Sequence, residues 1–395
     1  MAKAKAKHTA PSETVLQTSG VAADDGNILA VLAKRTYRFT PGRAELTVAD
    51  EQLALRLAPA FDSEGPDPTL LVTDTDLYPF KLLTDLVVRG HVYPEKKSYG
   101  HAAVRVGDVT KSLVAYGDRK AYRAHDGRIL FSAPEAFDKI PLTYARAYGG
   151  RDARSEAKNP WPLKRAAPHV EPKHVDVAAH SPYLYARNRH GCGYLFEATP
   201  ETLEELRLPN LEDPDDLLTG DRLVVPKVDA WHTMPLPAGT TWVPPSHFAR
   251  GVFMGLFPNW KPLPNPLREI ERGLLPARVA EINVFAGHPL VKRLANGASL
   301  GLAVPYLAPG AAIALTRLHP KAANMTITLP ANPPKIGVDG RNRKLAITKP
   351  VIHTVEIEPD LGRLSIVWRG AAPALRPYLP EELAKMPLVV EWRDE

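Results

Sequence analysis

The sequence contains a single cysteine, Cys192, among 395 residues. One cysteine excludes a disulfide within the chain and a zinc site built from several thiolates. No apolar run approaches the ~18 residues that a membrane-spanning helix needs. The first residues carry charge but no apolar stretch, so they do not resemble a secretory signal peptide. These features predict a soluble cytoplasmic protein.

The excess of basic over acidic residues is also small. The formal net charge is +6, and three of the lysines responsible, Lys3, Lys5 and Lys7, lie in the opening segment MAKAKAKH. Beyond this segment, acidic and basic residues alternate, without the dense basic block typical of nucleic-acid-binding proteins. We therefore expect a disordered basic tail over residues 1–12 and neither nucleic acid nor membrane as a partner.

Proline is the residue in excess, with 40 copies, about twice the usual share of ~5%. Proline breaks helix interiors and is tolerated in turns, loops and strand ends. β-prone runs dominate residues 13–150 and 276–395, whereas residues 151–275 form a loop-rich region dotted with proline and tryptophan. The sequence therefore predicts a mainly β protein with antiparallel, sandwich-like sheets, long proline-rich loops and a few short helices. These regions are either separate units or parts of one compact domain.

Turn dipeptides between β-prone runs recur about every ten residues, at Gly107-Asp108, Gly117-Asp118 and Asp126-Gly127. Glycine at the first central position suits a type II′ turn, and Asp-Gly suits type I′. This spacing predicts an antiparallel meander. A second hairpin is expected near the C-terminus, with its loop at residues 359–362.

Helix signals are few and short. In TPETLEEL, Thr199 can cap a helix whose first turn contains Glu201. PEELAKM, close to the C-terminus, is the second candidate.

The segment KIPLTYARAYGG, residues 139–150, combines alternation with two consecutive glycines. Gly149 and Gly150 would permit a backbone corner with positive φ that other residues adopt poorly. We expect Tyr144 and Tyr148 to pack inward beside this corner.

An enzyme is the alternative to a binding protein. Gly297 to Gly301 reads G-A-S-L-G, the pattern of a nucleophile elbow, and Asp339 and His353 follow Ser299 in the order of a hydrolase triad. The elbow requires a strand–turn–helix context, and Pro305 falls where the helix should run. We therefore expect no catalytic residues, and a hydrolase using Ser299, Asp339 and His353 remains the alternative.

A metal site is a further possibility in the loop-rich region, where four histidines precede or flank Cys192. They are His169, His174, His180 and His190, separated by five, six and ten residues. Zinc ligands usually come in closer pairs. We therefore expect neither a metal nor a cofactor.

Seven segments in order resemble a bacterial family known as domain of unknown function twenty-one sixty-nine. They are AVLAKRTYRF, TDTDLYPFKLLTDLVVRGHVYP, VRVGDVTKSLVAYGDRKAYR, FDKIPLTYARAYGG, NRHGCGY, LPNLEDP and LSIVWRG. The resemblance implies a non-enzymatic adaptor or chaperone that binds a type VI secretion effector and helps to load it onto a VgrG-type spike or PAAR tip. NRHGCG departs from the Asn-Pro-x-Gly-x-Gly pattern of many members, so the identity of the client does not carry over.

Aromatic and arginine side chains in the loop-rich region are candidates for holding such a client. Loops carry recognition more often than scaffold strands, and tryptophan and arginine supply many interface hot spots. The partner-binding candidates are Trp231, Trp242, Phe248, Arg250 and Trp260. The alternative is that these side chains are buried and hold the loops to the scaffold.

Overall fold

The computed structural model describes most of the chain, and the statements below concern this part. It comprises residues 14–20, 27–43, 45–78, 81–160, 181–228, 230–245, 247, 250, 268–272, 274, 295–338, 346–374 and 376–392.

A seven-stranded sheet joins the two ends of the chain. In spatial order its strands are β1 (Thr14–Gly20), β2 (Asn27–Arg38), β22 (Arg363–Ala374), β21 (Val351–Glu358), β6 (Thr84–Val88) and β16 (Ala303–Val304), with β3 (Thr47–Val48) pairing beside β2. Strands β2 and β22 run antiparallel in unbroken register from Asn27–Ala374 to Arg38–Arg363. Strands β21 and β6 are parallel, so the sheet is mixed rather than wholly antiparallel.

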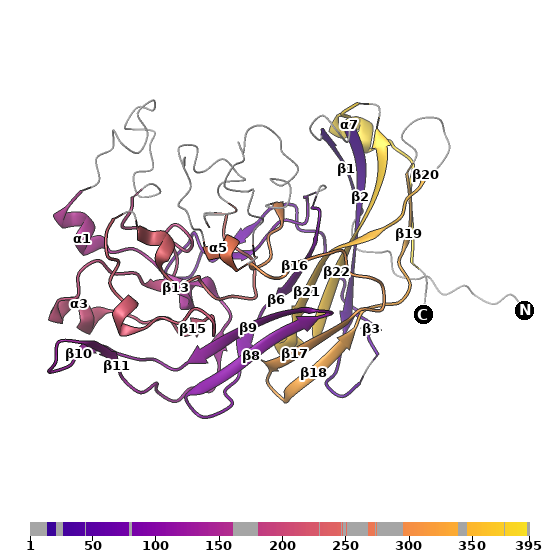
Figure 1. Ribbon diagram of the computed structural model, residues 1–395. Coiled ribbons are helices and arrows are strands. Elements are labelled where there is room, and N and C mark those ends of the chain that lie inside the picture. The colour runs from indigo at the N-terminus through magenta and orange to yellow at the C-terminus, as the bar shows by residue number, and fades with distance from the viewer. Residues whose placement is uncertain are drawn as a thin grey trace, which may run out of the picture.

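A five-stranded sheet packs against the first. Its order is β15 (Leu211–Glu212), β9 (Val109–Tyr116), β8 (Tyr99–Val106), β17 (Ala312–His319) and β18 (Ala322–Thr328). Alternation is clear along β8, where every second residue is buried, as expected for a strand with one face on a core. Figure 1 shows β8, β9, β17 and β18 beside the strands β6, β21 and β22 of the first sheet. Buried side chains of both sheets, among them Leu29, Val104, Leu315 and Ile366, belong to one hydrophobic cluster. The mainly β, sandwich-like fold is therefore confirmed, and N- and C-terminal segments build both sheets together.

The turn dipeptides behave differently from one another. Gly107 has φ 55°, while no non-glycine residue near it has positive φ, which matches the predicted type II′ turn between β8 and β9. Asp126 lacks the positive φ of a type I′ turn. Instead Gly127 donates its N–H to Ala124 O and itself adopts φ 85°, which is a type I turn followed by a glycine bulge.

The predicted continuous meander is wrong at Gly117. Strand β9 does not continue into a pairing with β10 (Ala121–Arg123); β10 pairs with β11 (Ile129–Phe131) in a separate hairpin. At Gly117 a Cβ would lie 1.8 Å from Glu135 O, so this glycine permits a close backbone approach.

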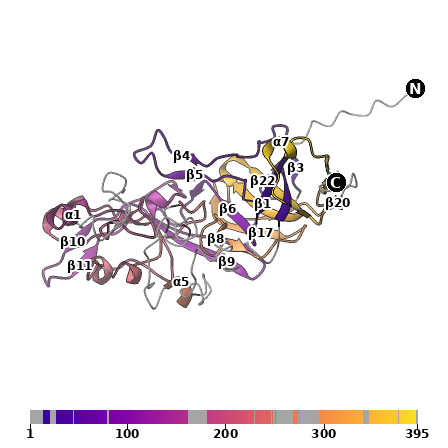
Figure 2. The same cartoon turned by 90° about the horizontal axis from the view of Figure 1, so that it is seen from above.

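A smaller lobe lies beside the sheets and has its own core. It contains β10, β11, α1 (Ala153–Lys158) and α3 (Pro200–Glu205), with the helices and the hairpin on one side of the molecule in Figure 2. Its buried cluster includes Tyr148, Tyr185, Tyr194 and Trp231. Helix α3 is capped as predicted, because the Thr199 side chain accepts a hydrogen bond from Thr202 N.

Short elements complete the described part. They are β4 (Ala60–Phe61), β5 (Leu71–Thr73), β7 (His91–Val92), β12 (Ile140–Pro141), η1 (Tyr144–Arg146), β13 (Tyr148–Gly149), β14 (Cys192–Gly193), η4 (Gly220–Arg222), η5 (Ala230–Thr233), α5 (Arg268–Glu271), β19 (Lys335–Val338), β20 (Ala346–Ile347), η9 (Pro359–Leu361), α7 (Pro380–Leu383) and β23 (Leu388–Glu391). The predicted late hairpin is confirmed, since η9 and Gly362 link β21 to β22. Among the helices of the described residues, none has the length and apolar character to cross a bilayer.

Candidate functional site

The first candidate site is a junction between two segments whose paired residues, such as Tyr148 and Cys192, are 44 positions apart in the sequence. Strand β13 pairs in parallel with β14, so YARAYGG lies beside NRHGCG. Asn188 ties them together: its Nδ2 donates to Tyr144 O at 2.7 Å and to Tyr148 O at 3.0 Å, and its carbonyl accepts from Gly150 N at 2.8 Å. Two of the segments that carry the family resemblance therefore form one structural unit.

The geometry of the junction requires both glycines of YARAYGG, Gly149 and Gly150. Gly149 has φ 148° and Gly150 has φ 100°, a region that L side chains rarely adopt. A Cβ on Gly149 would lie 2.1 Å from Asn188 O, and one on Gly150 would lie 2.5 Å from Gly191 O. The predicted positive-φ corner is confirmed, and it serves to let two backbones approach.

The tyrosines of this segment pack inward, as predicted. Tyr144 and Tyr148 are almost wholly buried. The Tyr148 ring makes an edge contact with Tyr185 at a centroid distance of 5.2 Å. Tyr144 OH lies 3.0 Å from Ser299 Oγ, and burial raises the pKa of Tyr144 to about 12, although this hydrogen bond opposes the shift. Tyr144 therefore connects the junction to the loop that contains Ser299.

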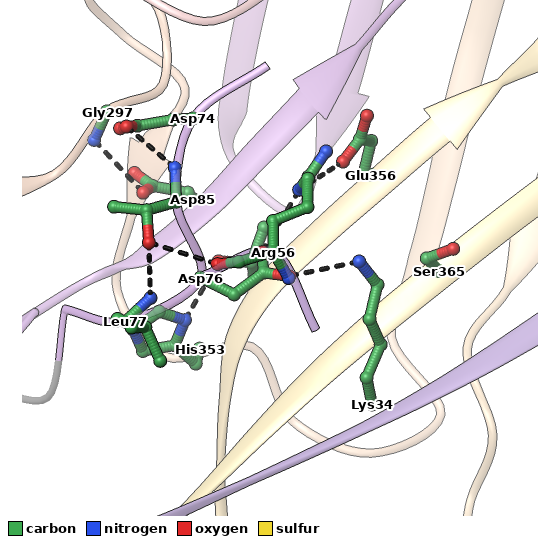
Figure 3. A network of polar contacts seen from close by, with 12 residues as sticks. Lys34, Arg56, Asp74, Asp76, Leu77, Asp85, Gly297, His353, Glu356 and Ser365 are labelled. Atoms are coloured by element: carbon green, nitrogen blue, oxygen red, sulfur yellow. Dashed lines mark hydrogen bonds and ion pairs between the residues drawn. The ribbon is translucent and has the colours of Figure 1, made fainter. Parts of the chain in front are cut away.

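The second candidate site is a buried network of charges between the seven-stranded sheet and residues 56–85 (Figure 3). Asp76 accepts from Lys34 Nζ at 3.0 Å and from Arg56 Nη2 at 3.0 Å. Arg56 also reaches Glu356 on β21 at 2.6 Å, and Arg89 contacts the same carboxylate at 2.8 Å. Five segments are thus linked by alternating charges: β2, β21, the end of β6, and the two loops that contain Arg56 and Asp76.

A second buried ion pair adjoins this network. Lys81 Nζ lies 2.6 Å from Asp85 Oδ2, and both side chains are fully buried. Asp85 accepts three further hydrogen bonds, from Asn296 Nδ2, Gly297 N and Ala298 N, at 2.9 to 3.1 Å. Asp85 therefore holds the start of the Gly297–Gly301 loop against β6.

The protonation states of these acids follow from their partners. Burial by itself would raise the pKa of Asp76, but the charges of Arg56 and Lys34 outweigh it, and the pKa lies below its ordinary value. Burial would also raise the pKa of Asp85, but the charge of Lys81 outweighs it, and this pKa too lies below its ordinary value. Both carboxylates are therefore ionised at neutral pH.

Trp242 lies at the centre of this charged interior and is completely buried. The Arg56 guanidinium lies 5.4 Å from its ring centroid and the Lys81 ammonium 5.3 Å from it. These are cation–π distances. Arg250 is also buried, donates to Val243 O at 2.6 Å and forms an ion pair with Asp74.

Trp231 lies in the core of the smaller lobe. The Arg187 guanidinium lies over its ring, 4.9 Å from the centroid, and Arg187 makes a bidentate pair with Glu269, at 2.5 and 2.7 Å. Both charged groups are fully buried. The interior therefore contains three of the partner-binding candidates, Trp231, Trp242 and Arg250. This is the alternative stated above, in which the side chains are buried and hold the loops to the scaffold. Phe248 and Trp260 lie outside the described residues.

The residues of the alternative hydrolase have separate partners. Ser299 Oγ donates to Thr241 O at 2.8 Å and contacts Tyr144. His353 lies on β21, with Nε2 2.6 Å from Tyr78 O and Nδ1 2.9 Å from Thr354 Oγ1. Burial, followed by the charge of Lys81, lowers the pKa of His353 well below its ordinary value. Ser299 and His353 are thus not hydrogen-bonded to each other, and Asp339 lies outside the described residues.

The histidines and the cysteine considered for a metal are only partly described. His169, His174 and His180 lie outside the described residues, while His190 Nδ1 lies 2.5 Å from Asp67 Oδ2. Burial raises the pKa of Cys192 to about 11, so the thiol is protonated at neutral pH. Within the described ranges, no three histidine, cysteine, aspartate or glutamate side chains gather as metal ligands do.

The buried charges were not singled out from the sequence, although two signals were present. Lys34 interrupts an apolar run in β2, and TDTDLYPFKLLTD places three aspartates and a lysine among apolar residues. Removing one partner of a buried ion pair is strongly destabilising, because it leaves an uncompensated charge in the interior. The network accordingly positions β6, β21 and the Trp242 segment relative to one another.

The fold and these contacts define a mainly β protein in which paired charges fix the loops to a two-sheet scaffold. Residues 24–369 match the family described as "Uncharacterized protein conserved in bacteria (DUF2169)", and the chain belongs to this family. No curated protein and no solved structure matches the chain.

Proposed function

We propose that this protein is a non-enzymatic adaptor or chaperone of a type VI secretion system. It binds an effector in the cytoplasm and helps to load it onto the VgrG-type spike or its PAAR tip. Membership of the DUF2169 family over residues 24–369, with the ordered segments described above, supports the proposal.

The hydrogen bonds of Ser299 and His353 favour an adaptor over a hydrolase. Each is occupied by its own interior partners, Thr241 and Tyr144 for the serine and Tyr78 and Thr354 for the histidine. A serine nucleophile needs its base within hydrogen-bond reach. The arrangement instead fits side chains that hold loops in place.

The client-binding surface is proposed to draw on the loop-rich region, residues 151–275. Since Trp231, Trp242 and Arg250 are buried, they act by shaping this region rather than by touching the client. Phe248 and Trp260 remain candidates for direct contact.

The test is co-purification with the effector encoded beside this protein's gene. We expect a stoichiometric complex, and loss of effector secretion when the adaptor gene is deleted. Secretion should return with the wild type and equally with Ser299→Ala. A protein that forms no complex but reacts with a fluorophosphonate probe, with labelling lost in Ser299→Ala, would establish the hydrolase instead.

A further inference from the structure

The five-stranded sheet ends in an edge strand that lacks charged residues and proline, two common protections against pairing, and the one irregularity in its pairing with β17 lies between Thr316 and His319. In the described part of the chain, β18 pairs with β17 alone, and it is seven residues long. Its sequence, AANMTIT, contains no charged residue and no proline. Natural edge strands are usually short, charged, bulged or interrupted by proline. The opposite edge, β15, is only two residues long.

The hydrogen-bonding groups that β18 presents to solvent follow from its register. Leu329 N donates to Ala311 O at 2.9 Å, immediately beyond the paired residues Ala312 and Thr328. Because inward- and outward-pointing pairs alternate along antiparallel strands, the backbone groups of Thr328, Thr326 and Asn324 point away from β17.

The side chains of β18 divide cleanly between its two faces. Asn324, Thr326 and Thr328 are exposed, whereas Met325 and Ile327 are buried in the shared core. A strand added to this edge would therefore need polar and apolar residues in the same alternation. The sequence of β18 itself has this alternation.

A cavity lies at the C-terminal end of the edge. Its volume is about 670 Å³, and it is lined by Glu45, Leu46 and residues 328–332. At the other end of β18, the tight turn from β17 carries the exposed Lys321. One end of the edge is thus acidic and the other basic.

We propose that two copies of this chain associate through β18, antiparallel about a two-fold axis at Thr326. In this register Asn324 of each copy faces Thr328 of the other, and about six backbone hydrogen bonds form. Met325 and Ile327 then lie side by side across the axis and join the two cores. Lys321 of one copy comes opposite residue 331 of the other, at the cavity that contains Glu45.

The arrangement is self-complementary in charge as well as in pattern. An isologous interface requires the same surface to match itself under the two-fold rotation. The uncharged strand places no like charges at the axis, and the Lys321–Glu45 contact occurs twice. The two sheets become one continuous ten-stranded sheet, and the exposed edge of each is covered.

Sedimentation equilibrium over a range of protein concentrations tests the proposal. We expect the mass to rise from one chain to two. Thr326→Lys places two ammonium groups at the axis and should raise the dimer dissociation constant by about tenfold or more. Thr110→Lys, at an exposed position of β9 in the same sheet, is the matched control and should leave the constant unchanged. A single-chain mass at every concentration, or a dimer that Thr326→Lys leaves intact, would overturn the proposal.

Charge reversal tests the register. Lys321→Glu and Glu45→Lys should each weaken the dimer, and the double variant should restore it. Failure of the double variant to recover would refute the pairing of these two residues.

Hydrogen exchange provides a readout that does not depend on variants. The amide protons of Asn324, Thr326 and Thr328 should exchange rapidly in dilute protein and slowly in concentrated protein. Slow exchange in a single-chain species would mean that another segment covers the edge, which contradicts the proposal.

Discussion

Replacing Gly149 with alanine is expected to destabilise this protein much more than replacing Gly107 with alanine. Both glycines have positive φ, 148° and 55°. They differ in the space around them: a Cβ on Gly107 meets nothing within 4 Å, whereas a Cβ on Gly149 would lie 2.1 Å from Asn188 O. The pair of variants therefore separates backbone strain from the close approach of the two segments.

The magnitudes follow from these two effects. A non-glycine residue at positive φ costs roughly 1–2 kcal/mol, which is the whole effect expected for Gly107→Ala. At Gly149 the alanine must also displace the Asn188 backbone, and overpacking in a rigid interior adds about 1–3 kcal/mol. Displacement would further weaken the bonds from Asn188 to Tyr144 O and Tyr148 O. Backbone strain and overpacking together give an expected loss of about 2–5 kcal/mol for Gly149→Ala.

Urea denaturation followed by tryptophan fluorescence and by circular dichroism would measure these losses. Two probes are needed because the smaller lobe, which holds Trp231, could unfold before the sheets. The expected order of unfolding free energies is wild type, then Gly107→Ala, then Gly149→Ala. Equal losses in the two variants would refute the argument that the glycine at 149 serves a close backbone approach.

Four further results are expected. Trp242→Ala should reduce the unfolding free energy by about 3–5 kcal/mol because the ring is fully buried, and any loss of client affinity should accompany a lower melting temperature. Asp85→Asn should cost a similar ~3–5 kcal/mol, because it leaves the buried Lys81 without its counter-charge; a variant as stable as the wild type in thermal melts would contradict this. The unfolding free energy should fall on acidification from pH 6.5 towards 4. Burial lowers the pKa of His247 to about 4 in the folded state, so the unfolded state takes up a proton at higher pH than the folded state does. In His247→Gln the melting temperature should therefore depend less on pH in this range. Ser299→Ala should retain effector secretion, and fluorophosphonate labelling of Ser299 would count against the adaptor.

Local features of the fold could be predicted because their causes are local. The Gly107-Asp108 turn and the cap of α3 by Thr199 depend on a few neighbouring residues, and both occur where the sequence placed them. The Asp126-Gly127 turn shows the limit of such rules. The dipeptide fits two turn types, and the structure adopts the one in which glycine alone takes positive φ.

The partners of the buried charges could not be predicted from the sequence. Lys34 and Asp76 are 42 residues apart, and Arg56 and Glu356 are 300 apart. No periodic pattern connects residues at these separations. Only two signals indicated an unusual environment: the position of Lys34 within an apolar run, and the charged residues among the apolar residues of TDTDLYPFKLLTD.

The burial of Trp242 could not be predicted for the same reason, because its neighbours come from distant parts of the sequence. A tryptophan in a proline-rich loop looks exposed because the loop itself has no apolar face. Trp242 belongs to the main hydrophobic cluster, and Arg56 and Lys81 from other segments also lie close to its ring. Each of these two cations is paired with an acid. Loops that lack hydrogen-bonded secondary structure need other contacts to be held in one conformation. In this protein ion pairs and cation–π contacts supply them, so the shape of the described loops depends on charges inside the scaffold. A substitution at Asp76 or Asp85 should therefore weaken the client binding that we propose, although neither side chain would contact the client.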